Sequence, residues 1–117
     1  MKLEGDRRLA RIYLGESDRQ SGMPLYEAIV QRARERGLAG ATVLRGIEGF
    51  GAASRIHRAS ILRLSEDLPI VVELVDERDK IERFLAELEP WIGGGMVTLE
   101  KVEVVLYRPG PGAGDGE

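Results

Sequence analysis

The chain has 117 residues, of which 20 are acidic and 17 basic, with one histidine and no cysteine. The net charge of −3 excludes a globally basic nucleic-acid-binding protein, and the lack of cysteine excludes disulfide chemistry and thiolate metal sites. No apolar run reaches the roughly 18 residues of a membrane-spanning helix, so we expect a cytoplasmic protein that does not insert into membranes. The length suits a single domain over residues 1–108, followed by a disordered Gly/Pro tail over residues 109–117.

The first half of the chain predicts two strands and one helix. An apolar run at 9–14 indicates a strand, and the turn-forming residues at 15–23 indicate a loop. Pro24 is expected at the first position of a helix, and Gly37 at its left-handed C-terminal cap. The segment 41–47, which contains the β-branched residues Thr42, Val43 and Ile47, then predicts a second strand.

The second half repeats this order with a strand, a helix and a last strand. The alternating apolar residues at 70–75 predict a strand. Asp76 is expected to cap the N-terminus of a helix that ends near Pro90. The last strand, at 97–106, changes the parity of its apolar positions around Glu100 and Lys101, which predicts either a bulge or a strand in two pieces there.

The order strand, helix, strand, strand, helix, strand is typical of the ferredoxin-like α+β fold. In that fold both helices cover one face of an antiparallel sheet. The other face is then apolar and uncovered unless copies of the chain pack on it. Because an exposed apolar patch of that size usually marks association, we expect an oligomer.

The segment 42–63 carries the densest functional signal in the chain. Gly46, Gly49 and Gly51 interrupt a strand pattern, which indicates a bend or a close approach by a ligand. We predict two strands joined by a long, glycine-hinged, cationic loop whose backbone N–H groups face a phosphate or a base. The alternative is a hinge that only lets the hairpin turn. The basic residues of this loop are Arg55, His57 and Arg58.

Residues 43–51, with the basic loop and strand that follow, resemble the second strand and T-loop entry of PII signalling proteins. The glycines at 93–95 stand where PII proteins have a glycine-rich B-loop, and Arg108 with the tail stands where they have a C-terminal loop. Further segments resemble an uncharacterised bacterial and archaeal family related to PII, domain of unknown function 190. These segments are residues 12–18, 24–29, 40–46 and 64–69.

This resemblance implies a homotrimer of ferredoxin-like subunits that binds adenine nucleotides in the clefts between neighbours and signals by changing the shape of its T-loop. Three departures argue against magnesium-nucleotide and 2-oxoglutarate binding of the PII kind. Ala52 replaces the glutamine that follows Gly-Phe-Gly, the lysine after the B-loop glycines is missing, and no tyrosine lies between residues 46 and 69.

We therefore expect a non-enzymatic, PII-like regulatory protein without a covalent cofactor or a metal site. It would bind a small anionic metabolite, with an adenine nucleotide as the first candidate, and signal to a protein partner. Phe50 is expected to pack its ring under the loop or to stack on a purine. The expected ligand-binding residues are Arg45, Gly46, Gly49, Phe50, Gly51, Arg55, His57, Arg58, Gly93, Gly94, Gly95 and Arg108.

Three alternatives remain open. The protein is a ligand-independent interaction module for a membrane transporter or channel. It is an enzyme at a cleft between subunits, with Glu16, Asp18 or His57 as acid–base groups. Or it binds a metal through carboxylates and His57. Under any of these functions, glycines 93–95 can equally form a plain helix-to-strand turn.

Overall fold

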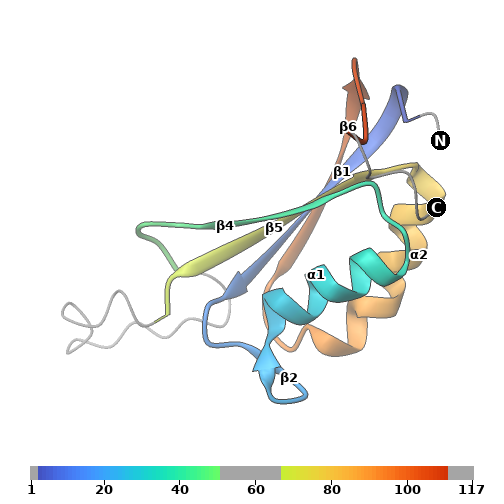
Figure 1. Ribbon diagram of the computed structural model, residues 1–117. Helices are drawn as coiled ribbons and strands as arrows, with labels where there is room; N and C mark the ends of the chain where they lie inside the picture. Colours follow the sequence, from blue (N-terminus) through green and yellow to red (C-terminus); the bar gives the residue numbers. More distant parts are fainter. Residues whose placement is uncertain (1–2, 51–66, 111–117) are drawn as a thin grey trace.

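The computed structural model describes residues 3–50 and 67–110. The described part forms a four-stranded antiparallel sheet in the order β4-β5-β1-β6, with two helices on one face (Figure 1). This arrangement confirms the ferredoxin-like fold. The strands of the sheet are β1 (Gly5–Gly15), β4 (Ala41–Arg45), β5 (Pro69–Asp76) and β6 (Met96–Val104). The helices are α1 (Leu25–Glu35) and α2 (Arg78–Leu88), and α2 continues into a 3-10 turn, η2 (Glu89–Trp91).

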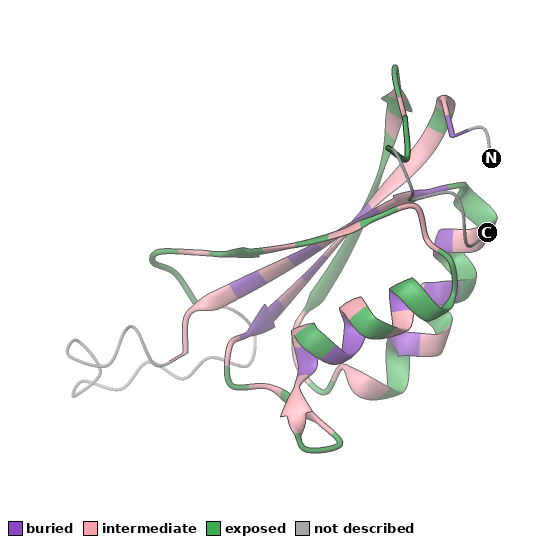
Figure 2. Ribbon diagram, in the orientation of Figure 1, coloured by how far each residue is buried: buried purple, intermediate pink, exposed green. Residues whose placement is uncertain are grey.

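The core lies between the helices and one face of the sheet (Figure 2). Alternate residues of β1 and β5 point to this face, as the strand periodicity requires. They pack against the apolar stripes of both helices, and each fully buried aliphatic side chain contributes about 1.5–3 kcal/mol. The buried core residues are Ala10, Ile12, Leu14, Leu25, Ile29, Ala33, Ile70, Val72, Leu74, Ile81, Phe84 and Leu88.

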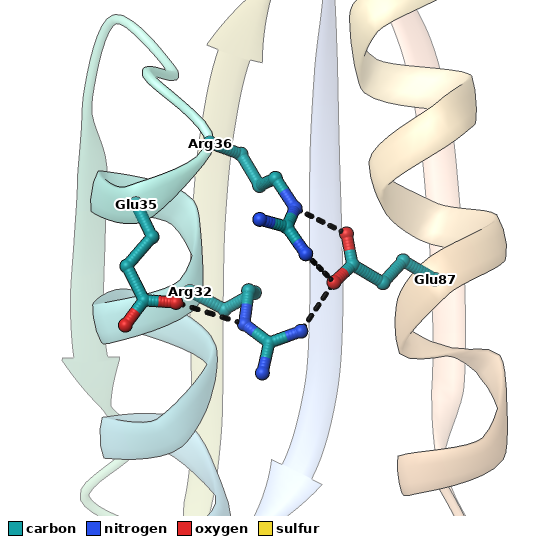
Figure 3. Close-up of polar contacts among 4 residues, drawn as sticks. All are labelled: Arg32, Glu35, Arg36 and Glu87. Carbon is teal, nitrogen blue, oxygen red and sulfur yellow. Dashed lines mark hydrogen bonds and ion pairs between the residues drawn. The ribbon is translucent and has the colours of Figure 1, made fainter.

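An ionic cluster joins the two helices on their solvent side (Figure 3). Glu87 of α2 accepts hydrogen bonds from Arg36 at 2.6 and 2.8 Å and a further one from Arg32. These hydrogen bonds from Arg36 and Arg32 lower the pKa of Glu87 to about 2. The Arg32 guanidinium also lies over the ring of Trp91, 5.0 Å from its centroid, and pairs with Glu35 at 3.0 Å.

The structure corrects several boundaries in the first half. β1 begins at Gly5, four residues before its apolar run, because main-chain pairing with β6 continues that far. The expected loop at 15–23 contains a short hairpin of β2 (Arg19–Gln20) and β3 (Met23–Pro24), whose turn residues Ser21 and Gly22 both have positive φ. Pro24 is therefore the residue before α1 rather than its first residue.

The second strand was also predicted too long. β4 ends at Arg45, and the expected end at residue 47 is wrong. Gly46 donates a last hydrogen bond to the carbonyl of Pro69 at 2.7 Å. Because proline has no N–H to return, the ladder cannot continue past it.

Asp76 is not the N-cap of α2. It is the last residue of β5, fully buried, and Glu77 stands at the cap position. The Asp76 carboxylate accepts the backbone N–H of Ala39 at 2.9 Å and of Glu77 at 2.7 Å, with the Lys80 ammonium 3.6 Å away. The side chain therefore fastens the connection between α1 and β4 to the end of β5.

The predicted bulge or division of the last strand is wrong. The pairing of β6 with β1 runs without interruption along the whole of β6, which ends at Val104 rather than at 106. Val97 and Leu99 lie opposite core residues of β1 on the helix side, whereas Val102 and Val104 lie on the other face. The apolar side chains of β6 therefore lie on the helix side in its first half and on the opposite face in its second half, without any break in the strand.

Candidate functional site

Both predicted glycine segments lie at one end of the sheet, which we call the glycine end. Here β4 and β1 finish while β5 and β6 begin (Figure 1). Gly46 follows β4 and Gly95 precedes β6, and these two strands form opposite edges of the sheet. Three strand spacings of about 4.8 Å put the two glycines roughly 14 Å apart. They share an end of the molecule but not a pocket within one chain.

A steric requirement accounts for Gly46. A Cβ atom at this position would lie 2.8 Å from Cγ of Pro69, whose ring cannot move aside easily. Gly49 follows with φ +146°, a conformation open mainly to glycine. The side chains beside them are exposed, with Ile47 at 94% and Phe50 at 72%. The prediction that Phe50 packs under the loop is therefore wrong, and its ring faces solvent.

Gly95 has an equally definite steric reason. Its φ is +151°, and a Cβ atom would lie 2.5 Å from the carbonyl oxygen of Tyr13 in β1. By contrast, a Cβ on Gly93 would meet nothing within 4 Å. In the turn before β6, the backbone conformation therefore requires glycine at position 95 but not at position 93.

The acidic turn after β1 also lies at the glycine end. Asp18 accepts the N–H of Gly15 at 3.0 Å, which closes the turn. Asp67 accepts the N–H and the hydroxyl of Ser17 at 3.1 and 2.9 Å, which ties the turn to the residues before β5. These carboxylates therefore stabilise the turn after β1 and its contact with the residues before β5. In the described part of the chain they offer little to the enzyme alternative.

Arg45 is the predicted ligand residue whose surroundings are clearest. Its guanidinium pairs with the Glu16 carboxylate, and 57% of the Arg45 side chain is exposed against 20% of the Glu16 side chain. The other Glu16 oxygen is buried without a hydrogen-bond partner. The N–H of Glu16 donates to the carbonyl of Leu68 at 2.9 Å. Glu16 thus links the only described arginine of the predicted T-loop entry to the point where the chain re-enters the sheet.

The remaining predicted residues are placed elsewhere or not described. Arg108 lies beyond the far end of β6, where Tyr107 donates through its N–H to Glu4 and through its hydroxyl to the carbonyl of Ala39 at 3.5 Å. One chain does not bring Arg108 together with Gly46. Gly51, Arg55, His57 and Arg58 lie outside the described residues, as does the predicted tail from residue 111 onward.

Two further observations concern metals and membranes. Among residues 3–50 and 67–110, no three His, Asp or Glu side chains come together in a way that could hold a metal ion. Neither helix of the described chain has the length and apolar character needed to cross a membrane.

Sequence reasoning missed two features of this end. One is the bridge from Ser17 to Asp67, and the other is the close contact of Gly46 with Pro69. The second left a sequence signal, because a glycine inside a strand pattern can mark a close approach by another part of the chain. The first depends on tertiary pairing, and no local pattern marks it.

The fold is that of PII-like proteins. CPII from Thiomonas intermedia K12, solved with ADP, AMP and acetate bound, matches with a TM-score of 0.62 and 17% identity, over 93% of this chain and 95% of that chain. A putative PII-like signaling protein (TTHA0516) from Thermus thermophilus matches with a TM-score of 0.58 and 23% identity, over 90% and 94% of the two chains. At these identities the likeness establishes the architecture.

The sequence comparison establishes the family. The model of the family described as "Uncharacterized ACR, COG1993" (DUF190) matches residues 7–104. A UPF0166 protein from Aquifex aeolicus (strain VF5) is 43% identical over 99 residues, which is 85% of this chain and 93% of that protein. The chain belongs to the DUF190 family, which confirms the resemblance noted from its sequence segments.

Proposed function

We propose that this is a PII-like regulatory protein. It forms a homotrimer and binds a small anionic metabolite, with an adenine nucleotide as the first candidate, in the clefts between copies. Occupancy of the clefts is read by a partner protein, such as a membrane transporter or channel, through the T-loop-like segment 46–58.

The observation that carries this proposal is the position of the two glycine turns. Gly46 and Gly95 lie at the same end of the sheet but at opposite edges. A ring of copies related by rotation brings the β4 edge of one copy beside the β6 edge of the next. A pocket that uses both turns is then formed only by assembly, whereas Arg108 lies at the other end of β6 in every copy of such a ring.

One side chain at the β4 edge suits contact with an anion. Arg45 presents a guanidinium that is more than half exposed, and its planar fork matches phosphate oxygens. Ordering such a side chain costs up to about 2 kcal/mol, whereas each charge-assisted hydrogen bond contributes about 1.5–3 kcal/mol. Several contacts of this kind give affinity in the micromolar class, which suits a metabolite sensor. The ADP and AMP in CPII make adenine nucleotides the first ligands to test.

Titration calorimetry of the full chain with ADP, AMP and ATP tests the ligand. We expect heat at micromolar concentrations for at least one nucleotide and weaker binding by Arg45→Gln. The matched control is Arg78→Gln, which removes an arginine from an exposed ion pair on α2, Arg78–Glu82 at 3.0 Å. Absence of any heat with millimolar nucleotide rejects the nucleotide. Sedimentation velocity of the same sample tests the trimer separately.

A ligand-independent interaction module is the second candidate, and one observation favours it. Ile47 and Phe50 are large apolar side chains, 94% and 72% exposed, where the chain leaves the sheet. Aromatic side chains such as Phe are enriched at protein interfaces. In that case Ile47→Ser and Phe50→Ser weaken binding of a transporter or channel partner, while nucleotides change that binding by less than twofold.

A further inference from the structure

The open face of the sheet, which we define as the face turned away from the helices, carries apolar and charged side chains in separate rows. Nearest the glycine end, one row crosses all four strands. Next to it lies a row of polar and charged residues. Cross-strand pairing places Leu44, Val71, Tyr13 and Met96 in the first row and Thr42, Glu73, Arg11 and Thr98 in the second.

An ion triad stands in the middle of this face. The Arg11 Nε donates to Glu73 of β5 at 3.0 Å, and its Nη1 donates to Glu100 of β6. One guanidinium thus serves two carboxylates on the strands to either side, and the triad keeps one net negative charge. The side chains are 35%, 29% and 52% exposed, respectively, so Glu100 remains the most open to a further partner.

We propose that this triad fixes the alignment of copies of the chain that meet on the open face. This inference rests on the proposed trimer and names the residues that select its geometry. Apolar side chains such as Leu44 (48% exposed) and Met96 (53% exposed) favour contact but tolerate sliding. The triad does not, because Arg11 neutralises only one of its two carboxylates, and the excess charge on Glu100 needs a donor from the neighbouring copy once it is buried.

A second copy is the occupant that suits this face. The face carries both signs of charge in the same region, so it can meet itself, whereas a face of one sign would repel its copy. It also adjoins the two edges that the proposed clefts use. The hydroxyl-bearing side chains of Tyr13, Thr42 and Thr98 lie on the same face. They provide donors that a neighbouring copy can direct at the excess carboxylate of Glu100.

If the triad fixes the alignment, two variants should affect assembly in different ways. Arg11→Met leaves Glu73 and Glu100 facing a neighbour without their cation, so assembly weakens. Replacement of the whole triad by apolar residues (Arg11→Met, Glu73→Leu and Glu100→Leu together) removes the buried charges, so copies associate again but without one preferred alignment. This sample should contain several oligomeric sizes.

Sedimentation velocity and equilibrium on the full chain test the proposal. We expect the dissociation constant to rise about 100-fold or more in Arg11→Met, to recover in the triple variant, and to stay at the wild-type value in Arg78→Met. If circular dichroism shows that Arg11→Met does not fold, Arg11→Lys is measured in its place. One ammonium cannot span both carboxylates as the fork does, so the constant should rise about tenfold.

The outcomes separate this inference from the proposed function. A wild-type protein that stays monomeric at all concentrations overturns the proposed trimer, and the alignment role with it. A wild-type trimer whose dissociation constant is unchanged in Arg11→Met and in Arg11→Lys overturns the alignment role alone. A triple variant with one oligomeric size identical to wild type also contradicts it.

Discussion

Replacing Gly95 by alanine should cost this protein about 2–6 kcal/mol of unfolding free energy, which is the sum of two parts. The φ of +151° is strained for any residue with a side chain, at about 1–3 kcal/mol. The new Cβ would also lie 2.5 Å from the carbonyl oxygen of Tyr13. That oxygen belongs to the central strand β1, so relief requires a main-chain shift, for which overpacking costs of about 1–3 kcal/mol apply.

Chemical denaturation followed by fluorescence measures this loss. Trp91 is the single tryptophan and lies four residues before the substitution, so it reports on the right part of the fold. Gly93→Ala is the matched control, because its Cβ meets nothing within 4 Å. It should be neutral or stabilise by up to about 1 kcal/mol through the unfolded chain. Both variants are measured at one protomer concentration, since association adds stability by mass action.

An unfolding free energy for Gly95→Ala within about 0.5 kcal/mol of wild type would refute the steric reasoning. The comparison also bears on function. Loss of nucleotide binding in Gly95→Ala can follow from the altered backbone alone. Loss in Gly93→Ala, with stability intact, would indicate direct contact between that turn and the ligand.

Three further outcomes are expected. The pKa of Glu87 is about 2 in the folded protein and higher in the unfolded chain. The stabilisation from ionised Glu87 is therefore complete above the unfolded pKa and is lost as the pH falls from about 4.5 to 2. The urea midpoints at pH 7 and pH 3 should differ more in wild type than in Glu87→Gln. Asp76→Ala should cost about 2–4 kcal/mol, because the backbone N–H groups of Ala39 and Glu77 lose their carboxylate acceptor. An unchanged denaturation midpoint would contradict this. Glu16→Gln should tighten nucleotide binding about two- to fivefold, because an exposed ion pair with Arg45 worth roughly 0.4–1 kcal/mol no longer competes; calorimetry showing equal or weaker affinity would exclude that competition.

The order of elements followed directly from the sequence, because the core strands and both helices show their apolar periodicity plainly. The errors arose where tertiary structure overrides a local signal. Asp76 before Glu77 is a typical helix start, yet pairing with β1 holds it in the strand and burial gives its carboxylate two backbone partners. The parity change in β6 resembles a bulge because sequence alone cannot show that both faces of this edge strand carry apolar groups.

The sequence drew attention to the two glycine turns but gave no account of their geometry, and the predicted ligand contacts stay a prediction. Glycine density suggested ligand contact, yet Gly46 and Gly95 each have a steric reason within the fold, namely Pro69 and the carbonyl of Tyr13. Their glycine identity is therefore weak evidence for a ligand. The stronger evidence is positional, since two such turns at one end and on opposite edges of a sheet can cooperate only across copies. Binding measurements on Gly93, whose identity the backbone does not require, consequently test the ligand more sharply than any substitution at 46 or 95.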